Sequence, residues 1–412
     1  MKKTRVTAVL IATALTLLTV TIASALTHYV VWGDTLWGLS RYYGTTIDAI
    51  VQANAQITDP NLIYAGDYLE IPVETAVIPL PTAVPPPTLI PPPLPTATAV
   101  PSPAPGLALG GQTLVLAYPA KMNEAGMNWV KFQYKWTAGD SPTVIASAIA
   151  AGHNQGFKVL ISVTGANEYP PPGSINFASY IEFMRGLAAL NPDAVEVWHE
   201  QNIDFEWPAG EISPVSYTNN MLAPVYQAVK AVNPHIMVIS GALAPTGFDN
   251  GYNAWADNRY LTGMYQAGAA TYMDCIGAHY NAGATSPTQT VGHPAGNHYS
   301  WYFLPMLNLY HNTFGGRLPV CFTELGYLSG AGFLGVPDDF WWAADTTVAE
   351  QAEWVAEAAQ LSINSGKVGL MAVFNVDYTE YDLNGDPQAG YAMIRPDGTC
   401  PACVTLGVVM AK

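Results

Sequence analysis

Basic residues are scarce in this chain, and the shortage limits the partners that it can bind. The 412 residues include 15 Lys and Arg against 31 Asp and Glu. Loss of the first 25 residues, which hold three of the basic residues, would leave 12 against 31 and a net charge of −19. Nucleic acids and other anionic polymers are bound by clustered Lys and Arg side chains. We therefore expect no nucleic acid partner, and uncharged substrates are favoured.

Cysteine is also rare, with four residues: Cys275, Cys321, Cys400 and Cys403. Four are too few to build a fold of this size on disulfides, although pairing is possible if the chain is exported. The Cys400-Pro-Ala-Cys403 spacing is compatible with half of a metal site or with a redox pair, but the sequence has no second CxxC and no His beside this one. A short surface disulfide is the favoured interpretation, and no cofactor follows from it.

Two motifs that begin like metal sites lack a ligand. His199-Glu200 starts the zinc-protease pattern HExxH, but position 203 is Ile203, so the second His is missing. The segment Asp382-Leu-Asn-Gly-Asp386 resembles an acidic calcium loop without the glutamate that closes an EF-hand, and a solvated turn is the favoured interpretation. We therefore expect neither a metal nor a cofactor.

The N-terminus has the three parts of a secretory leader. Met1–Arg5 is basic, residues 6–23 are uncharged and mostly apolar, and Ala23-Ser24-Ala25 is a small-x-small cleavage pattern. This predicts a signal peptide over residues 1–25. The alternative is an uncleaved anchor helix, because the apolar run approaches the length of a membrane span. Either form makes the chain extracellular, secreted or associated with a cell wall.

Residues 74–106 differ in composition from the rest of the chain. Twelve of these 33 residues are proline, interleaved with Thr, Ala and Val, and only Glu74 is charged. Such a segment is a linker, and in polyproline II form at ~3.1 Å per residue it would hold its flanks up to roughly 100 Å apart. The linker divides a small domain, residues 27–73, from a large one, residues 107–412.

The small domain starts with a short β-type run, continues with two short helical patterns and closes with the strand Asp67–Val73. It resembles a LysM module: Val30-x-x-Gly-Asp-Thr-Leu-x-x-Leu39, Asn54 and the Ala65-Gly-Asp67 turn fall in register. The resemblance implies a βααβ fold that binds glycans containing N-acetylglucosamine, peptidoglycan or chitin. The residues implied to line its groove are Gly33, Asp34, Thr35, Leu36, Asn61, Leu62 and Ile63. The alternative is a vestigial module in which Trp32 and Trp37 only fill a small core.

The large domain alternates β-rich apolar runs with helical patterns, which is typical of a parallel sheet. The candidate strands are Thr113–Ala117, Trp129–Tyr134, Lys158–Val163, Ala194–His199, His235–Ser240, Cys275–His279, Leu318–Thr323 and Val368–Phe374. The helical stretches include Ser141–Gln155, Ile175–Leu190, Pro214–Val232 and Thr346–Ser365. Eight such units predict an α/β fold of the (β/α)8 TIM-barrel type, with the functional residues at the carboxyl ends of the strands.

Polar residues that alternate with apolar ones in such a barrel point inward. In the second strand this places Lys131, Gln133 and Lys135 inside, and a buried lysine needs a carboxylate partner. Lys131 is therefore either half of an ion pair or a group that orients substrate. In the fourth strand the same rule turns Glu196 and Trp198 inward.

The fourth strand leads to His199-Glu200, which we expect at the barrel mouth. The later Asp204 and Glu206 are expected to be solvated on a loop. The seventh strand ends similarly in Glu324. Two carboxylates at strand ends across one mouth can cleave a glycosidic bond, at about 5 to 5.5 Å separation if configuration is retained.

Residues 107–412 resemble clan A glycoside hydrolases, through Trp198-His-Glu-Gln-Asn202 after strand four and Thr323-Glu-Leu-Gly326 after strand seven. The resemblance implies that Glu200 is the acid/base, with a raised pKa, and that Glu324 is the nucleophile of a retaining hydrolase. His199 departs from the Asn that the clan most often has there, although some mannan-cleaving members have His, so the sugar is left open. The candidate substrate-binding residues are His199, His279, Tyr280, Lys131, Phe374 and Trp341.

These residues predict a secreted hydrolase of a β-linked polysaccharide, directed to cell-wall or chitin-like glycan by its LysM module. Phe374 stands where many clan members offer a tryptophan as a sugar platform, and Trp341 or Trp342 could serve instead. His279 and Tyr280 are each either a partner of the nucleophile or a packed core residue. The alternative function is a non-catalytic glycan-binding protein with a degenerate barrel.

Overall fold

The computed structural model describes residues 24–30, 36, 39–40, 43, 45–57, 63, 67–73, 107–381 and 387–411. The chain divides into two compact units, residues 1–91 and 92–412, and each is described by itself. The predicted linker, most of the signal peptide and the acidic turn at 382–386 lie outside the described residues and stay predictions.

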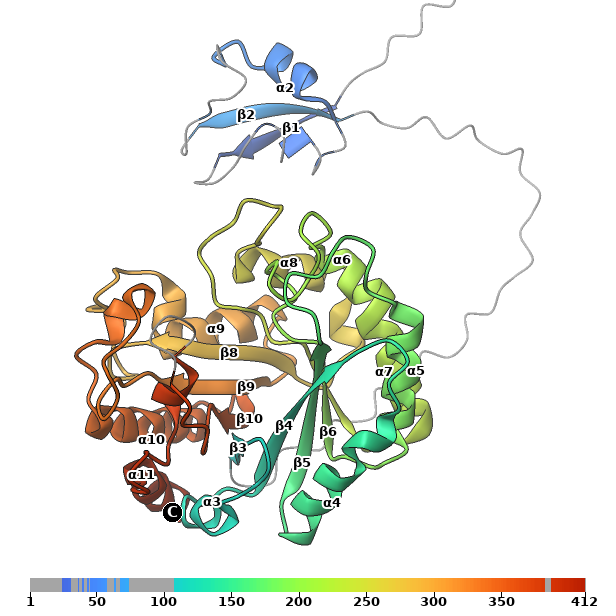
Figure 1. Cartoon of the computed structure of the whole chain (residues 1–412). Coiled ribbons are helices and arrows are strands. Elements are labelled where there is room, and N and C mark those ends of the chain that lie inside the picture. The colour runs from blue at the N-terminus through green and yellow to red at the C-terminus, as the bar shows by residue number, and fades with distance from the viewer. Residues whose placement is uncertain are drawn as a thin grey trace, which may run out of the picture. The chain divides into compact units, whose positions relative to one another are not determined.

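In the N-terminal unit a two-stranded antiparallel sheet packs against a helix. β1 (Ser24–Tyr29) pairs with β2 (Tyr68–Val73), and α2 (Ile47–Ala53) lies between them in the sequence (Figure 1). Most residues of the other expected helix lie outside the described part. Because β1 begins at Ser24, the predicted cleavage after Ala25 would remove its first two residues.

Side-chain caps and a small core fix α2. The helix begins after Thr46, whose hydroxyl accepts a hydrogen bond from the Ala49 amide. At its other end the buried Asn54 donates to the carbonyls of Ile50 and Glu70 at 2.7 and 2.6 Å and accepts from the Glu70 amide at 2.8 Å, which fastens α2 to β2. The buried apolar residues are Val30, Leu36, Leu39, Ile50, Leu69 and Ile71.

The larger unit is a barrel of eight parallel strands, as the sequence predicts. The strands are β3 (Ala108–Gln112), β4 (Trp129–Trp136), β5 (Lys158–Gly165), β6 (Ala194–Val197), β7 (Met237–Ser240), β8 (Ile276–Gly283), β9 (Val320–Tyr327) and β10 (Val368–Val373). Their order is β7-β6-β5-β4-β3-β10-β9-β8. β7 and β8 complete the ring through isolated parallel bridges, Ile239–Cys275 and Leu243–Ala278.

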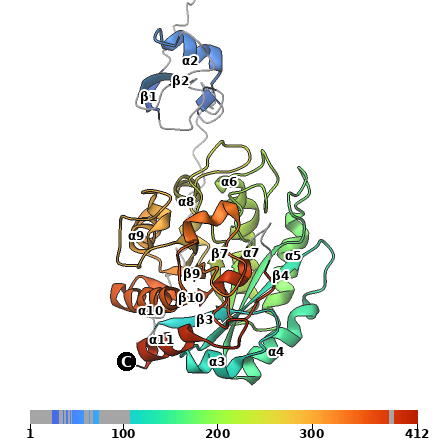
Figure 2. The same ribbon diagram turned by 60° about the vertical axis from the view of Figure 1, so that its left-hand side comes forward.

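Helices surround the barrel on its outer side (Figures 1 and 2). They are α3 (Pro119–Glu124), α4 (Ala146–Asn154), α5 (Phe177–Ala188), α6 (Pro214–Ser216), α7 (Ala223–Val232), α8 (Asp257–Gln266), α9 (Phe303–Thr313), α10 (Val348–Ser365) and α11 (Pro401–Met410). The four helical stretches that the sequence predicts are confirmed, and a π-helical segment, Tyr217–Leu222, joins α6 to α7. Within the described ranges, no helix has the length and apolar character needed to cross a bilayer.

The first strand is not the predicted one. The pattern pointed to Thr113–Ala117, whereas β3 lies five residues earlier and contains Gly110 and Gly111. Glycine lowers strand propensity, so the pattern hid this segment. The structure explains the glycine: a Cβ on Gly110 would lie 2.8 Å from the Cβ of Trp129 on the neighbouring strand.

Both cysteine pairs form disulfides. Cys275 and Cys321 join the amino-terminal ends of β8 and β9 inside the barrel, where both are buried. Cys400 and Cys403 pair at the start of α11, which confirms the expected short disulfide. The expectation of a surface position was wrong, because Cys403 is only 1% exposed and packs in the core between the helices and the sheet.

Candidate active site

The chain after β6 carries the first predicted catalytic carboxylate. β6 ends at Val197, and the backbone then turns, with φ of +68° at Trp198 and +46° at Glu200. Such values are uncommon for residues other than glycine. The turn sends the Trp198 ring against Tyr180 and Trp207 in the helix-side core, so the expected inward direction was wrong.

Two buried tyrosines hold this turn. The Tyr180 hydroxyl donates to the Val163 carbonyl at 2.8 Å and accepts from the Trp198 amide at 3.0 Å. The Tyr217 hydroxyl donates to the Val197 carbonyl at 2.7 Å and accepts from an amide just after β7 at 2.7 Å. The Trp198 amide also donates to the Val163 carbonyl at 3.1 Å, so the two hydroxyls add hydrogen bonds to the buried backbone on both sides of the turn.

The two predicted catalytic carboxylates meet at one imidazole. Nδ1 of His279, on β8, lies 2.8 Å from Oε1 of Glu200 and 3.8 Å from Oε2 of Glu324, on β9. These two oxygens are therefore no farther apart than the sum of 2.8 and 3.8 Å, about 6.6 Å. The side chain of Glu200 is 20% exposed and that of Glu324 is 6% exposed, so Glu200 is the more open to a ligand.

Lys131 is the buried lysine that the alternation on the second strand predicts. Its Nζ lies 3.0 Å from Glu324 and 3.8 Å from Glu196. Glu196 is fully buried, as expected, and also accepts from the Thr323 hydroxyl at 2.7 Å. Lys131 is only 1% exposed, so it contacts the carboxylates and has no surface to offer a ligand directly.

Asn281 is a site residue that the sequence reasoning missed. Its Nδ2 donates to Oε2 of Glu324 at 3.2 Å. β8 continues to Gly283, and residues 279 and 281 lie on the same face of a strand. Tyr280 lies on the other face, fully buried in the core, with its hydroxyl donating to the Trp301 carbonyl. Of the two alternatives for Tyr280, the structure agrees with the packed core residue, and period-two alternation over a longer strand would have selected Asn281.

Glu206 is buried, contrary to the expected solvated position. Its Oε2 accepts from the Thr164 hydroxyl at 2.6 Å, and its Oε1 lies 3.9 Å from Nε2 of His199. The same Nε2 lies 3.8 Å from Glu200, so the His199 ring stands between two carboxylates. Asp204, by contrast, is half-buried and accepts from Asn253 on the next loop.

The charges of this cluster set its pKa values. Burial would raise the pKa of Glu324, but the cations His279 and Lys131 outweigh it and hold that pKa at about 2. Burial acts on Glu200 likewise, and the charge of His199 with the hydrogen bond from His279 holds its pKa below the ordinary value. The carboxylates raise the pKa of His279, although burial alone would lower it. The expected raised pKa of Glu200 was therefore wrong, because its interactions with His199 and His279 outweigh the effect of burial.

Ligand-capable atoms of His199, Glu200 and His279 all lie within 4.8 Å of one another. Two imidazoles and a carboxylate are a donor set that Zn²⁺ accepts. An ion there would replace the proton in the bond between His279 and Glu200. That the chain uses no metal stays a prediction.

The predicted aromatic platforms differ in exposure. Phe374, directly after β10, is 9% exposed and packs on Tyr391. Trp341, in the 3₁₀ segment Asp338–Ala343, is 56% exposed. Trp342 is half-buried beside His293. Of the three, Trp341 offers the most ring surface to a ligand.

The predicted groove of the LysM module lies largely outside the described residues. The described residues do not include Gly33, Asp34, Thr35, Asn61 or Leu62. Leu36 is buried in the module's core, so its side chain packs there and does not present surface to a glycan. Ile63 is half-buried and packs against the same core.

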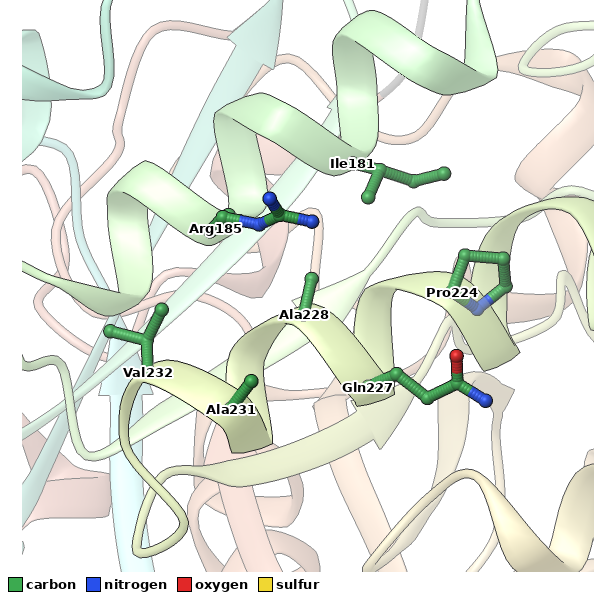
Figure 3. Close-up of a pocket in the computed structure, with 7 residues that line it drawn as sticks. All are labelled: Ile181, Arg185, Pro224, Gln227, Ala228, Ala231 and Val232. Atoms are coloured by element: carbon green, nitrogen blue, oxygen red, sulfur yellow. The ribbon is translucent and has the colours of Figure 1, made fainter.

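Two of the cavities in the described part of the chain differ in size and position. The larger, about 480 Å³, is a groove between α5 and α7, and Figure 3 shows its residues: Ile181, Arg185, Pro224, Gln227, Ala228, Ala231 and Val232. Arg185 is the only ionisable residue among them, so this groove lacks the groups for acid or base chemistry. The smaller, about 130 Å³, lies at the carboxyl ends of β3 and β10.

Comparison with known proteins identifies the small domain. The LysM domain model matches residues 28–72. The chain is also 50% identical over 56 residues to the probable endopeptidase p60 of Listeria monocytogenes. That match covers 14% of this chain and 11% of p60, so it spans a small part of the relative.

The large domain is similar to solved glycosidase barrels. A family 39 glycoside hydrolase from Bacteroides cellulosilyticus aligns with a TM-score of 0.51 and 18% identity, over 74% of this chain and 64% of that one. A glucosidase from Croceicoccus marinus aligns with a TM-score of 0.52 and 12% identity, over 75% and 69%. At such identity the likeness concerns the fold alone. The chain thus combines a LysM domain with an eight-stranded barrel of the kind found in glycoside hydrolases.

Proposed function

We propose that this protein is a secreted glycoside hydrolase that cleaves a β-linked polysaccharide with retention of configuration. Glu200 would be the acid/base and Glu324 the nucleophile. The observation that carries the proposal is the placement of both carboxylates against Nδ1 of His279, with their nearest oxygens within about 6.6 Å. A retaining pair stands about 5 to 5.5 Å apart and an inverting pair about 6.5 to 9.5 Å, so the bound favours the retaining arrangement.

The two carboxylates differ in the way that a double displacement requires. Glu324 is held ionised by Lys131 and receives a hydrogen bond from Asn281. In the first step its oxygen would bond to the anomeric carbon while the glycosidic bond breaks and Glu200 gives a proton to the leaving oxygen. In the second step Glu200 would take a proton from water, whose oxygen displaces Glu324 from the sugar.

The proton that Glu200 must donate lies within the cluster. Nδ1 of His279 lies 2.8 Å from Oε1 of Glu200, so a proton carried by His279 would shift along this contact to give a neutral imidazole and a protonated acid. A leaving oxygen that approaches Glu200 favours this shift, because it accepts the proton in turn. The His199 side chain is 11% exposed and its Nε2 lies 3.8 Å from Glu200, which places it to contact a sugar next to the cleaved bond.

The LysM domain would hold the enzyme on a glycan that contains N-acetylglucosamine, such as peptidoglycan or chitin. The full chain should bind insoluble chitin or peptidoglycan, and soluble chitotetraose should release it. Cellotetraose, which lacks the acetamido groups, is the control. Equal release by both oligosaccharides would contradict the proposed specificity.

Activity is tested on a panel of soluble β-glucans, mannans, xylans and chitooligosaccharides. Glu200→Gln and Glu324→Gln should each lower the turnover of whichever glycan is cleaved by at least about 10³-fold. Glu182→Gln, an exposed carboxylate on α5, is the matched control and should keep full activity. A 2-fluoro glycosyl fluoride of the cleaved sugar should label Glu324. Activity intact in both variants would overturn the assignment.

A second candidate is a glycan-binding protein without turnover, and the lowered pKa of Glu200 favours it, because an ionised acid cannot protonate a leaving group. Calorimetry on the same panel separates the two. Binding of an oligosaccharide that is recovered uncleaved after long incubation supports the binding protein, and its conversion to shorter products supports the hydrolase.

A further inference from the structure

The incomplete motif His199-Glu200 gains a second histidine from another strand of the barrel. In the sequence, Ile203 stands where the zinc-protease pattern needs that histidine. In the fold, His279 of β8 supplies an imidazole instead, since its Nδ1 lies 2.8 Å from Oε1 of Glu200. Nε2 of His199 lies 3.8 Å from Oε2 of the same carboxylate. Two imidazoles therefore face one carboxylate, one at each of its oxygens.

The spacing of these three donors is close to that of the ligands around a metal ion. One donor atom from each residue can be chosen so that all three lie within 4.8 Å of one another. Zn²⁺ binds imidazole nitrogen and carboxylate oxygen at about 2.0 to 2.2 Å, which sets tetrahedral ligands about 3.3 Å apart. The contacts of 2.8 and 3.8 Å lie on either side of that value, so the side-chain rotations that would close the site are small.

The charges around the donors favour a cation. Four carboxyl groups belong to this cluster, those of Glu196, Glu200, Glu206 and Glu324, against the single lysine Lys131. An imidazole must be neutral to bind a metal, so the cluster with neutral imidazoles has an excess of negative charge. A divalent cation between the imidazoles and Glu200 would offset that excess where water screens it little.

Access and outer hydrogen bonds indicate a weak site that exchanges its ion. The side chains of Glu200 and His199 are 20% and 11% exposed, so an ion can enter and keep one position for water. Nδ1 of His199 and Nε2 of His279 have no hydrogen-bond partner within the described part of the chain. Metal-bound histidines usually donate from this second nitrogen, and loss of such a partner weakens binding about 10- to 100-fold. We therefore expect a dissociation constant in the micromolar range.

We propose that His199, Glu200 and His279 form a binding site for one divalent transition-metal ion, represented by Zn²⁺, and that the bound ion inhibits the enzyme. Imidazole suits Zn²⁺, Cu²⁺ and Ni²⁺, whereas Mg²⁺ and Ca²⁺ prefer oxygen ligands, so the last two should not compete. An ion on the Glu200 carboxylate prevents that group from giving its proton to the leaving oxygen. The inhibition rests on the proposed hydrolase function, whereas the binding site does not.

Calorimetric titration with ZnCl₂ tests the site on the full-length protein, made without a polyhistidine tag and dialysed free of metal and chelator. We expect one Zn²⁺ per chain with micromolar affinity, and no comparable binding of Mg²⁺ or Ca²⁺. His199→Asn and Glu200→Gln each remove one ligand and should weaken binding at least about 10-fold. The matched control is His153→Asn on α4, since the partly exposed His153 lies 2.9 Å from Asp193 and also pairs an imidazole with a carboxylate. This variant should bind Zn²⁺ as the wild type does.

Equal affinity in the wild type, His199→Asn and Glu200→Gln would overturn the site, as would loss of the ion in His153→Asn. If His199→Asn does not fold, Glu200→Gln, which keeps the shape of the side chain, decides alone.

The inhibition is measured on whichever glycan the protein cleaves. Zn²⁺ at ten times its dissociation constant should lower turnover about 10-fold, and EDTA should restore it. Binding of Zn²⁺ that leaves turnover unchanged would overturn the inhibition. If no glycan is cleaved, the hydrolase proposal fails by itself, and the calorimetry with the three variants still decides whether the metal site exists.

Discussion

Replacement of Lys131 by methionine tests whether the buried charges of the barrel depend on one another. Lys131 is 1% exposed and contacts Glu324 at 3.0 Å and Glu196 at 3.8 Å. The fall in the pKa of Glu324 from 4.5 to about 2 corresponds to roughly 3 kcal/mol of net favourable interaction. His279 and then Lys131 are the largest favourable sources of it. Glu196 is buried and pairs with no other cation among the described residues of the barrel, so loss of Lys131 also leaves it without a cationic partner.

We expect Lys131→Met to lower the free energy of unfolding at pH 7 by about 3 to 5 kcal/mol, since removal of one partner leaves a buried charge uncompensated. The deficit should shrink as the pH falls. Glu324 has a depressed pKa in the folded state, so its contribution is complete above its ordinary pKa and is lost as the pH falls toward 2. In the variant the carboxyl takes up a proton at higher pH, which relieves the unpaired charge.

The matched control is Lys135→Met, four residues along the same strand. Lys135 pairs with Glu168 at 3.6 Å, but both side chains are more than half exposed, so the pair contributes at most about 1 kcal/mol. Urea unfolding of the full chain at pH 7 and pH 4 measures both variants. A Lys131→Met deficit no larger than that of the control, or one that stays constant between the two pH values, would refute the electrostatic account.

Two further predictions concern other buried groups. Burial raises the pKa of Glu206, so ionisation of this carboxyl lowers the stability of the fold as the pH rises. The melting temperature of Glu206→Gln minus that of the wild type should therefore be larger at pH 8 than at pH 4. A difference that does not depend on pH in thermal melts would contradict this. The disulfide Cys275–Cys321 closes a loop of 46 residues, whereas Cys400–Cys403 closes one of three. Alanine replacement of the first pair should lower the free energy of unfolding by roughly 4 kcal/mol, and replacement of the second pair by roughly 1.5 kcal/mol. Equal losses in urea unfolding would argue that the stabilisation does not arise from the entropy of the unfolded chain.

The sequence pattern was sufficient to predict the repeating β/α units of the fold. Apolar strands and amphipathic helices alternate with a regular spacing, so seven of the eight strands and the four named helices were located from the pattern. The burial of Lys131 and Glu196 followed from period-two alternation in the same way, because an inward-facing charge in a packed barrel must be paired. The first strand failed, because Gly110 is selected by the close approach of Trp129, which no local pattern records.

The site was harder to predict where the chain leaves regular structure. The positive φ angles at Trp198 and Glu200 break the alternation after β6, so Trp198 was assigned to the wrong side. Glu206 follows that turn, and its burial depends on Thr164 from the preceding strand and on His199. Both contacts depend on the tertiary structure. From the sequence alone, a polar segment after the end of a strand is therefore predicted to be a solvated loop.

The order of charges across the barrel explains why a low pKa at Glu200 is compatible with acid catalysis. Acidic and basic side chains alternate along the series Glu206, His199, Glu200, His279, Glu324, Lys131 and Glu196. Transfer of the proton from His279 to Glu200 leaves the total charge of this series unchanged, because the cation and the anion are neutralised together. A proton carried by His279 can therefore reach Glu200 without exchange with solvent, and the two groups titrate as a coupled pair. The alternation also keeps Glu324 ionised during the transfer, since Lys131 remains charged beside it.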